Sequence, residues 1–163
     1  MYAPDLATEC EVASGDAVRA IGWLAAGQPF TRAPIDPRFL AALRSHASDP
    51  GRWMPFESAG VHFCDLGGCR RAGGSGVVII PSRACVYVAP DLVEHYVEQH
   101  QYAPPAELVA AVLACPAQSS EAYIDLLLPF ARIWSLDGDG VRRIGAEARS
   151  RRQPHAGEGG FKW

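Results

Sequence analysis

The chain has 163 residues, of which 48% are hydrophobic and 20% are charged, and its formal net charge is −3. This length suits one domain whose core needs no disulfide bonds, and the charge gives no general reason to expect a nucleic acid partner. The longest apolar run, residues 124–133, is interrupted by Asp125, Pro129 and Arg132 and is too short to span a bilayer.

The N-terminus and the cysteines bear on the cellular compartment. Residues 1–6 lack the basic and apolar regions of a signal peptide. The chain has five cysteines, and an odd number favours free thiols or metal ligands over a disulfide framework. We therefore expect a cytoplasmic protein.

Strands are predicted mainly in the first part of the chain. Residues 18–24 form the first predicted strand, and residues 61–64 form a short second one. Residues 77–80 and 85–88 are rich in β-branched side chains and separated by turn residues, a pattern typical of a β-hairpin. One helix interrupts this series, because Asp36 and Pro37 suit an N-cap and a first helical position. It is predicted to end near residue 46.

Helices are predicted to dominate the rest of the chain. Three follow one another over residues 91–101, 105–114 and 120–128, each opened by Pro or Ser residues. Residues 137–140, Asp-Gly-Asp-Gly, predict a turn between two short extended segments. From residue 146 onward the chain is polar and rich in Arg and Gly, which predicts a disordered basic tail.

A series of strands followed by a series of helices indicates an α+β fold. We expect a small, mostly antiparallel sheet of three or four strands packed by three or four helices, with the helices concentrated in the C-terminal half. The predicted organisation is a single globular domain over residues 1–145 and a tail over residues 146–163.

The most informative motif is His-Phe-Cys-Asp-Leu-Gly-Gly-Cys at residues 62–69. His62 and Cys64 are two residues apart, so on a strand they would face the same side. The glycines before Cys69 allow a tight turn that brings its thiol back toward them. Imidazole and thiolate are typical ligands of tetrahedral zinc sites. These three residues therefore predict that the protein binds zinc.

The fourth ligand is sought on the predicted helix that contains His95 and His100. On a helical wheel His100 falls within the apolar face and His95 at its border, and about 100° per residue places them about 140° apart. This angle argues against both binding one ion. We favour His95 as the ligand and His100 as a core or pocket residue, although His100 or water could take the fourth position.

Two zinc-dependent functions compete on this pattern. A closed site of four protein ligands would be structural, and loss of the metal would unfold the protein. Such a small module would have a binding or regulatory role, and its partner could be another protein. An open site with three protein ligands and a water would instead suit a hydrolase, with His100 or Glu98 as general base. We prefer the closed site, because the sequence offers ligands but no clear catalytic set.

A third hypothesis has no metal. Cys64 and Cys69 would then be buried thiols of an ordinary α+β domain or a redox pair. Redox pairs normally have closer spacing and lie beside a helix N-terminus, so this hypothesis ranks last.

Overall fold

The computed structural model describes residues 2–56, 60–69 and 72–152. Its central sheet has the strand order β3 (Val18–Ala20), β7 (Val86–Pro90) and β6 (Val77–Pro81). β6 and β7 pair antiparallel, which confirms the predicted hairpin, whereas β3 runs parallel to β7. The first strand is shorter than predicted, since it ends at Ala20.

Two small antiparallel sheets accompany the central one. β1 (Glu9–Cys10) pairs with β2 (Ala13–Ser14), and β4 (His62–Phe63) pairs with β5 (Gly73–Gly74). The pairing of β4 with β5 brings residues 62–69 and 72–74 together, and we call these described residues the cysteine hairpin because they include Cys64 and Cys69.

The helices lie mostly in the C-terminal half, which confirms the α+β prediction. Three of the predicted helices agree with the structure within a few residues at each end. The last predicted one continues directly into a 3-10 helix. The helical elements are α1 (Pro37–Ala47), α2 (Val93–His100), α3 (Ala106–Ala114), α4 (Glu121–Leu127), the 3-10 helix η1 (Leu128–Trp134) and α5 (Gly138–Arg152).

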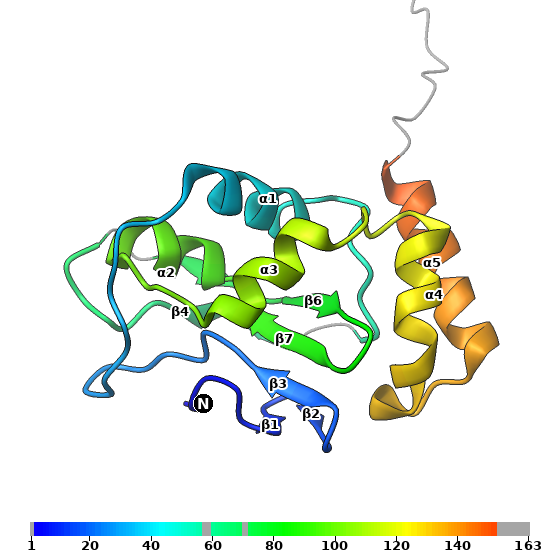
Figure 1. Cartoon of the computed structure of the whole chain (residues 1–163), viewed down its shortest axis with the longest axis horizontal. Helices are drawn as coiled ribbons and strands as arrows, with labels where there is room; N and C mark the ends of the chain where they lie inside the picture. Colours follow the sequence, from blue (N-terminus) through cyan, green and yellow to red (C-terminus); the bar gives the residue numbers. More distant parts are fainter. Residues whose placement is uncertain (1, 57–59, 70–71, 153–163) are drawn as a thin grey trace, which may run out of the picture.

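Helices cover both faces of the central sheet. Side chains alternate along β6, so that Val77 and Ile79 join one hydrophobic cluster while Val78 and Ile80 join the other. The first cluster is completed by α4, η1 and α5, and the second by α1, α2 and α3. Figure 1 shows α1, α2 and α3 gathered beside β6 and β7, with α4 and α5 as a separate pair. The sheet is therefore a buried middle layer.

The structure corrects the prediction for residues 137–140. Asp137 begins a helix, because its Oδ1 accepts a hydrogen bond from the Gly140 N–H at 2.8 Å and its carbonyl accepts one from Val141 N–H at 3.1 Å. α5 then runs through the predicted domain boundary at residue 145, and Val141, Ile144 and Ala148 bury its apolar face. Residues 146–152 are thus helical where a disordered tail was predicted. The rest of that tail, residues 153–163, lies outside the described residues.

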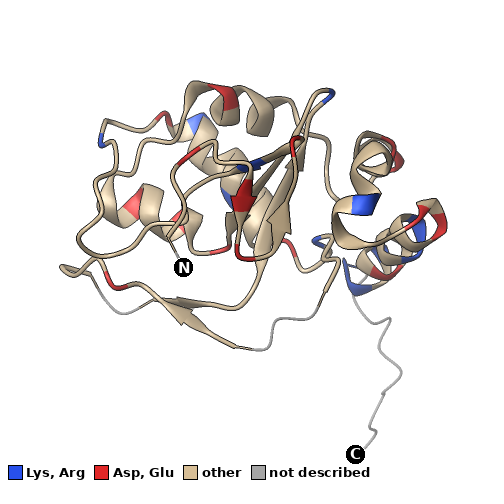
Figure 2. Ribbon diagram, turned by 90° about the horizontal axis from the view of Figure 1, so that it is seen from below, with Lys and Arg blue, Asp and Glu red and all other residues tan. Residues whose placement is uncertain are grey.

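Four of the five arginines of α5 have acidic partners within the fold, and the fifth, Arg151, donates to backbone carbonyls. Arg142 lies 3.8 Å from Glu121 and 3.9 Å from Asp125, and Arg149 lies 2.9 Å from Glu121. Figure 2 shows both signs of charge interspersed on this pair of helices. Each of these exposed pairs contributes little to stability, but together they leave α5 without a uniform basic face.

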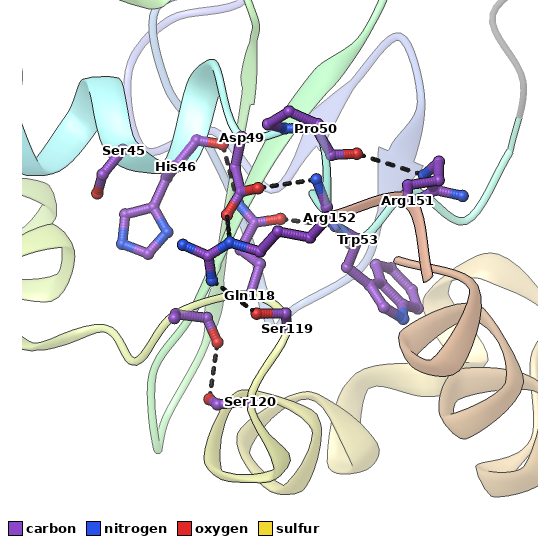
Figure 3. A network of polar contacts seen from close by, with 12 residues as sticks. Ser45, His46, Asp49, Pro50, Trp53, Gln118, Ser119, Ser120, Arg151 and Arg152 are labelled. Atoms are coloured by element: carbon purple, nitrogen blue, oxygen red, sulfur yellow. Dashed lines mark hydrogen bonds and ion pairs between the residues drawn. The ribbon is translucent and has the colours of Figure 1, made fainter. Parts of the chain in front are cut away.

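A buried polar network joins the helices of the two layers at the end of α1. Gln118 accepts a hydrogen bond from the Trp53 N–H at 2.8 Å and donates one to the His46 carbonyl at 3.3 Å (Figure 3). Trp53 in turn donates from its indole to the Val141 carbonyl of α5 at 3.1 Å. The loop after α1 is therefore held against the C-terminal helices.

Within the described part of the chain, no helix combines the length and the apolar character needed to cross a membrane.

Candidate metal centre

The cysteine hairpin brings its two thiols together by a glycine turn. Gly67 and Gly68 have φ angles of 72° and 71°, in the left-handed region that glycine adopts without strain. The Cys64 N–H donates to the Ala72 carbonyl at 2.9 Å, which continues the pairing beyond β4. The Sγ atoms of Cys64 and Cys69 consequently lie 3.6 Å apart. The predicted turn back toward Cys64 is thus present.

Helix α2 supplies two imidazoles to the same place. It packs on the sheet through Val93, Tyr96 and Val97, the face that the wheel predicts to be buried. The helix ends at His100, because Gln101 adopts a left-handed conformation. The His100 Nε2 lies 3.3 Å from the Cys64 Sγ.

The rings of His95 and His100 meet in an edge-to-face arrangement, with centroids 5.2 Å apart. One donor atom from each of Cys64, Cys69, His95 and His100 lies within 4.8 Å of every other. We call this group the Cys2His2 cluster. Its donor atoms are within metal-binding distance and compatible with a structural zinc site.

One atom of the cluster is buried without a hydrogen-bond partner. The His95 Nε2 has no partner among the described residues. A buried polar atom in that state costs about 1–3 kcal/mol, and native structures usually satisfy such atoms. A buried imidazole nitrogen without a partner, on a residue of the Cys2His2 cluster, is consistent with a metal ligand.

Burial also sets the protonation of the cluster. It lowers the pKa of His95, which Glu98 partly opposes, and it lowers the pKa of His100, to which His95 and Arg32 add. Both rings are therefore held in the neutral form that binds metals. Burial raises the pKa of the Cys64 thiol, partly offset by a hydrogen bond from the Leu66 backbone, so a metal ion must displace its proton.

The structure places His62 outside the cluster. Its Nε2 lies 3.3 Å from the Glu11 carboxylate, and its side chain is 53% exposed. The assigned strand β4 ends at Phe63, and although one backbone hydrogen bond continues the pairing at Cys64, the two side chains do not share one site. Of the four predicted ligands, the structure brings Cys64, Cys69 and His95 together.

His100 takes the place predicted for His62. The wheel angle argued against both histidines serving one ion, but it describes only the direction in which each side chain leaves the helix. The side chains extend away from the helix axis, and the two imidazole rings meet near the C-terminal end of α2. The inward position of His100 on the wheel was the available signal for its role.

A cavity of about 820 Å³ opens beside the cluster, with His95 in its wall. Glu98, the other predicted general base, also lines it and is ion-paired with Arg44 at 3.0 Å. Glu94 accepts from the same guanidinium at 2.6 Å, so the acidic wall is largely neutralised by protein partners. The cavity gives solvent a route to the His95 side of the cluster.

Comparison with known proteins identifies the N-terminal part of the chain. No curated protein and no solved structure matches it. A family model described as a domain of unknown function, DUF7919, matches residues 1–113. The match spans more than half of the chain and includes every residue of the Cys2His2 cluster, whereas α4, η1 and α5 lie beyond it. The chain belongs to the DUF7919 family.

Proposed function

We propose that the protein is a cytosolic zinc-binding module whose structural metal is held by Cys64, Cys69, His95 and His100. The observation that carries this proposal is the convergence of four donor atoms within 4.8 Å. In addition, the Nε2 of His95 is buried and has no hydrogen-bond partner among the described residues. The five free cysteines agree with a reducing compartment.

The measured separations suit a tetrahedral ion. Zinc lies about 2.3 Å from thiolate sulfur and about 2.0 Å from imidazole nitrogen. In a tetrahedron these bond lengths separate two sulfurs by about 3.8 Å, and a sulfur from a nitrogen by about 3.5 Å. The cluster has 3.6 Å between the sulfurs and 3.3 Å between the Cys64 Sγ and the His100 Nε2.

The number of donors favours a structural role over the hydrolase alternative. A catalytic zinc keeps one position open for water, whereas four protein ligands fill the tetrahedral shell. The candidate base Glu98 is also engaged by Arg44. The metal would then connect the cysteine hairpin to α2, two elements that come from separate parts of the chain.

The binding role rests on what this hairpin presents. Its short strands offer few backbone hydrogen bonds, so a metal would rigidify it. The neighbouring Val61 and Phe63 are 56% and 47% exposed, and their side chains lie over Gly73 of the paired strand. We propose that the metal-stapled hairpin offers this apolar surface to another protein.

Metal analysis of the purified protein tests the proposal. We expect one zinc ion per chain in the wild type and in His62→Ala, and loss of zinc in Cys69→Ser and His100→Ala. His62→Ala is the matched control, since it removes an imidazole of the same hairpin that lies outside the cluster. Zinc that depends on His62, or a folded wild type that binds none, would contradict the proposal.

X-ray absorption at the zinc edge separates the closed site from the open one. The closed site requires two sulfur and two nitrogen neighbours at about 2.3 and 2.0 Å. An oxygen neighbour in place of one imidazole would favour the hydrolase alternative.

A further inference from the structure

The thiols of the Cys2His2 cluster differ from the other cysteines of the chain. Cys64 and Cys69 are half-buried on a turn whose residues Asp65, Gly67 and Gly68 are exposed. A small solute can therefore approach them from solvent.

The remaining thiols are less available. Cys10 and Cys85 are buried. Cys115 is half-buried, and burial raises the pKa of its thiol to about 12, so it carries almost no thiolate at neutral pH. Cys64 and Cys69 are therefore the two described thiols that combine a place on an exposed turn with a partner sulfur 3.6 Å away.

The turn between the two cysteines has room to adjust. A disulfide bond requires the sulfurs to approach from 3.6 Å to about 2.05 Å. Gly67 and Gly68 are both open to space, with no atom within 4 Å of the position that a Cβ would take. The two glycines can therefore change conformation without displacing a neighbour, while Leu66 keeps the start of the turn packed on the second hydrophobic cluster.

We propose that a hydroperoxide oxidises Cys64 and Cys69 to an intramolecular disulfide and thereby releases the metal. This regulation rests on the proposed zinc site, which it would make sensitive to oxidants. The two histidines that remain are too few to retain zinc, so the cysteine hairpin would lose its connection to α2.

The chemistry balances with hydrogen peroxide as the oxidant. One thiolate attacks the peroxide, whose O–O bond breaks to give a sulfenic acid and hydroxide. The second thiolate attacks the sulfenic sulfur, the S–S bond forms, and a second hydroxide leaves. The two sulfurs lose two electrons, the peroxide gains them, and the two hydroxides take up protons from solvent to form water.

The test begins with protein whose zinc content has been measured. A preparation without zinc refutes the proposed function before any oxidant is added, so the two proposals fail separately. Zinc-loaded protein is then treated with hydrogen peroxide while a chromogenic indicator reports free zinc, and the products are mapped by mass spectrometry.

We expect one zinc ion to be released for each Cys64–Cys69 disulfide, and reductant with added zinc to restore the loaded form. Cys115→Ser is the matched control, because it removes a thiol outside the cluster and should release zinc at an unchanged rate. Zinc retained under peroxide, or released with sulfinic acids and without that disulfide, would overturn the inference.

Discussion

The buried amide of Gln118 allows a sharp test of how the C-terminal helices are attached. Gln118 is 1% exposed, and its two side-chain hydrogen bonds satisfy the Trp53 N–H and the His46 carbonyl. Gln118→Met keeps the length of the side chain but offers no replacement for either bond. Two buried backbone groups would then lose their partners.

The expected cost follows from these two bonds. Each buried group left unsatisfied costs about 1–3 kcal/mol. The bond to Trp53 is short at 2.8 Å and the bond to His46 is longer at 3.3 Å, which places the second near the lower end. We therefore expect Gln118→Met to lower the free energy of unfolding by about 2–4 kcal/mol, a large share of the about 5–15 kcal/mol typical of a domain.

Urea unfolding followed by tryptophan fluorescence measures this loss. With an m-value of about 2 kcal/mol/M, the midpoint should fall by about 1–2 M. Ser119→Ala is the matched control, because Ser119 Oγ bonds the exposed Arg152 at 3.0 Å, and it should stay within about 0.5 kcal/mol of the wild type. A Gln118→Met variant as stable as that control would refute the reasoning.

Three further predictions concern stability. Tyr123→Phe removes a buried hydroxyl that donates to the Ile79 carbonyl at 2.8 Å, so calorimetry should show a loss of about 1–2 kcal/mol, and an unchanged Tm would contradict that bond. Leu127→Ala should cost about 2–5 kcal/mol in urea unfolding, because Leu127 is fully buried between the sheet and α5, and a smaller cost would mean that the site collapses around the cavity. Burial lowers the pKa of His46 from its usual 6.5, so protonation favours the unfolded chain, and stability should fall as pH drops below about 6.5. A His46→Gln variant with the same pH dependence as the wild type would contradict this assignment.

Local patterns were sufficient for much of the fold. The hairpin of β6 and β7 depends on neighbouring residues whose alternation is visible in the sequence, and α1 begins at Asp36 and Pro37 as their chemistry predicts. The parallel pairing of β3 with β7 joins residues such as Val18 and Val86, and no local pattern specifies a partner at that distance. For residues 137–140, helix start and hairpin turn use the same Asp and Gly residues, so only the packing of α5 decides between them.

The candidate metal centre likewise combines local features that the sequence predicts with contacts between distant residues that it does not predict. The glycine turn that joins Cys64 to Cys69 is local, and its shape follows from residue types. The exclusion of His62 depends on Glu11, far earlier in the chain, and on where β4 ends. The convergence of His100 with the thiols depends on how α2 packs on the sheet. A helical wheel describes one helix alone and carries no information about that packing.

The order in which the sheet and its covering helices occur along the chain has a consequence for synthesis on the ribosome. The sheet is complete once Pro90 has been made, but one of its faces is covered by α4, η1 and α5, which end at Arg152. At about 5–20 residues per second, translating the intervening ~60 residues takes roughly 3–12 s. Until those helices have been made, the face of the sheet that carries Val77 and Ile79 lacks the cover that α4, η1 and α5 provide in the finished fold.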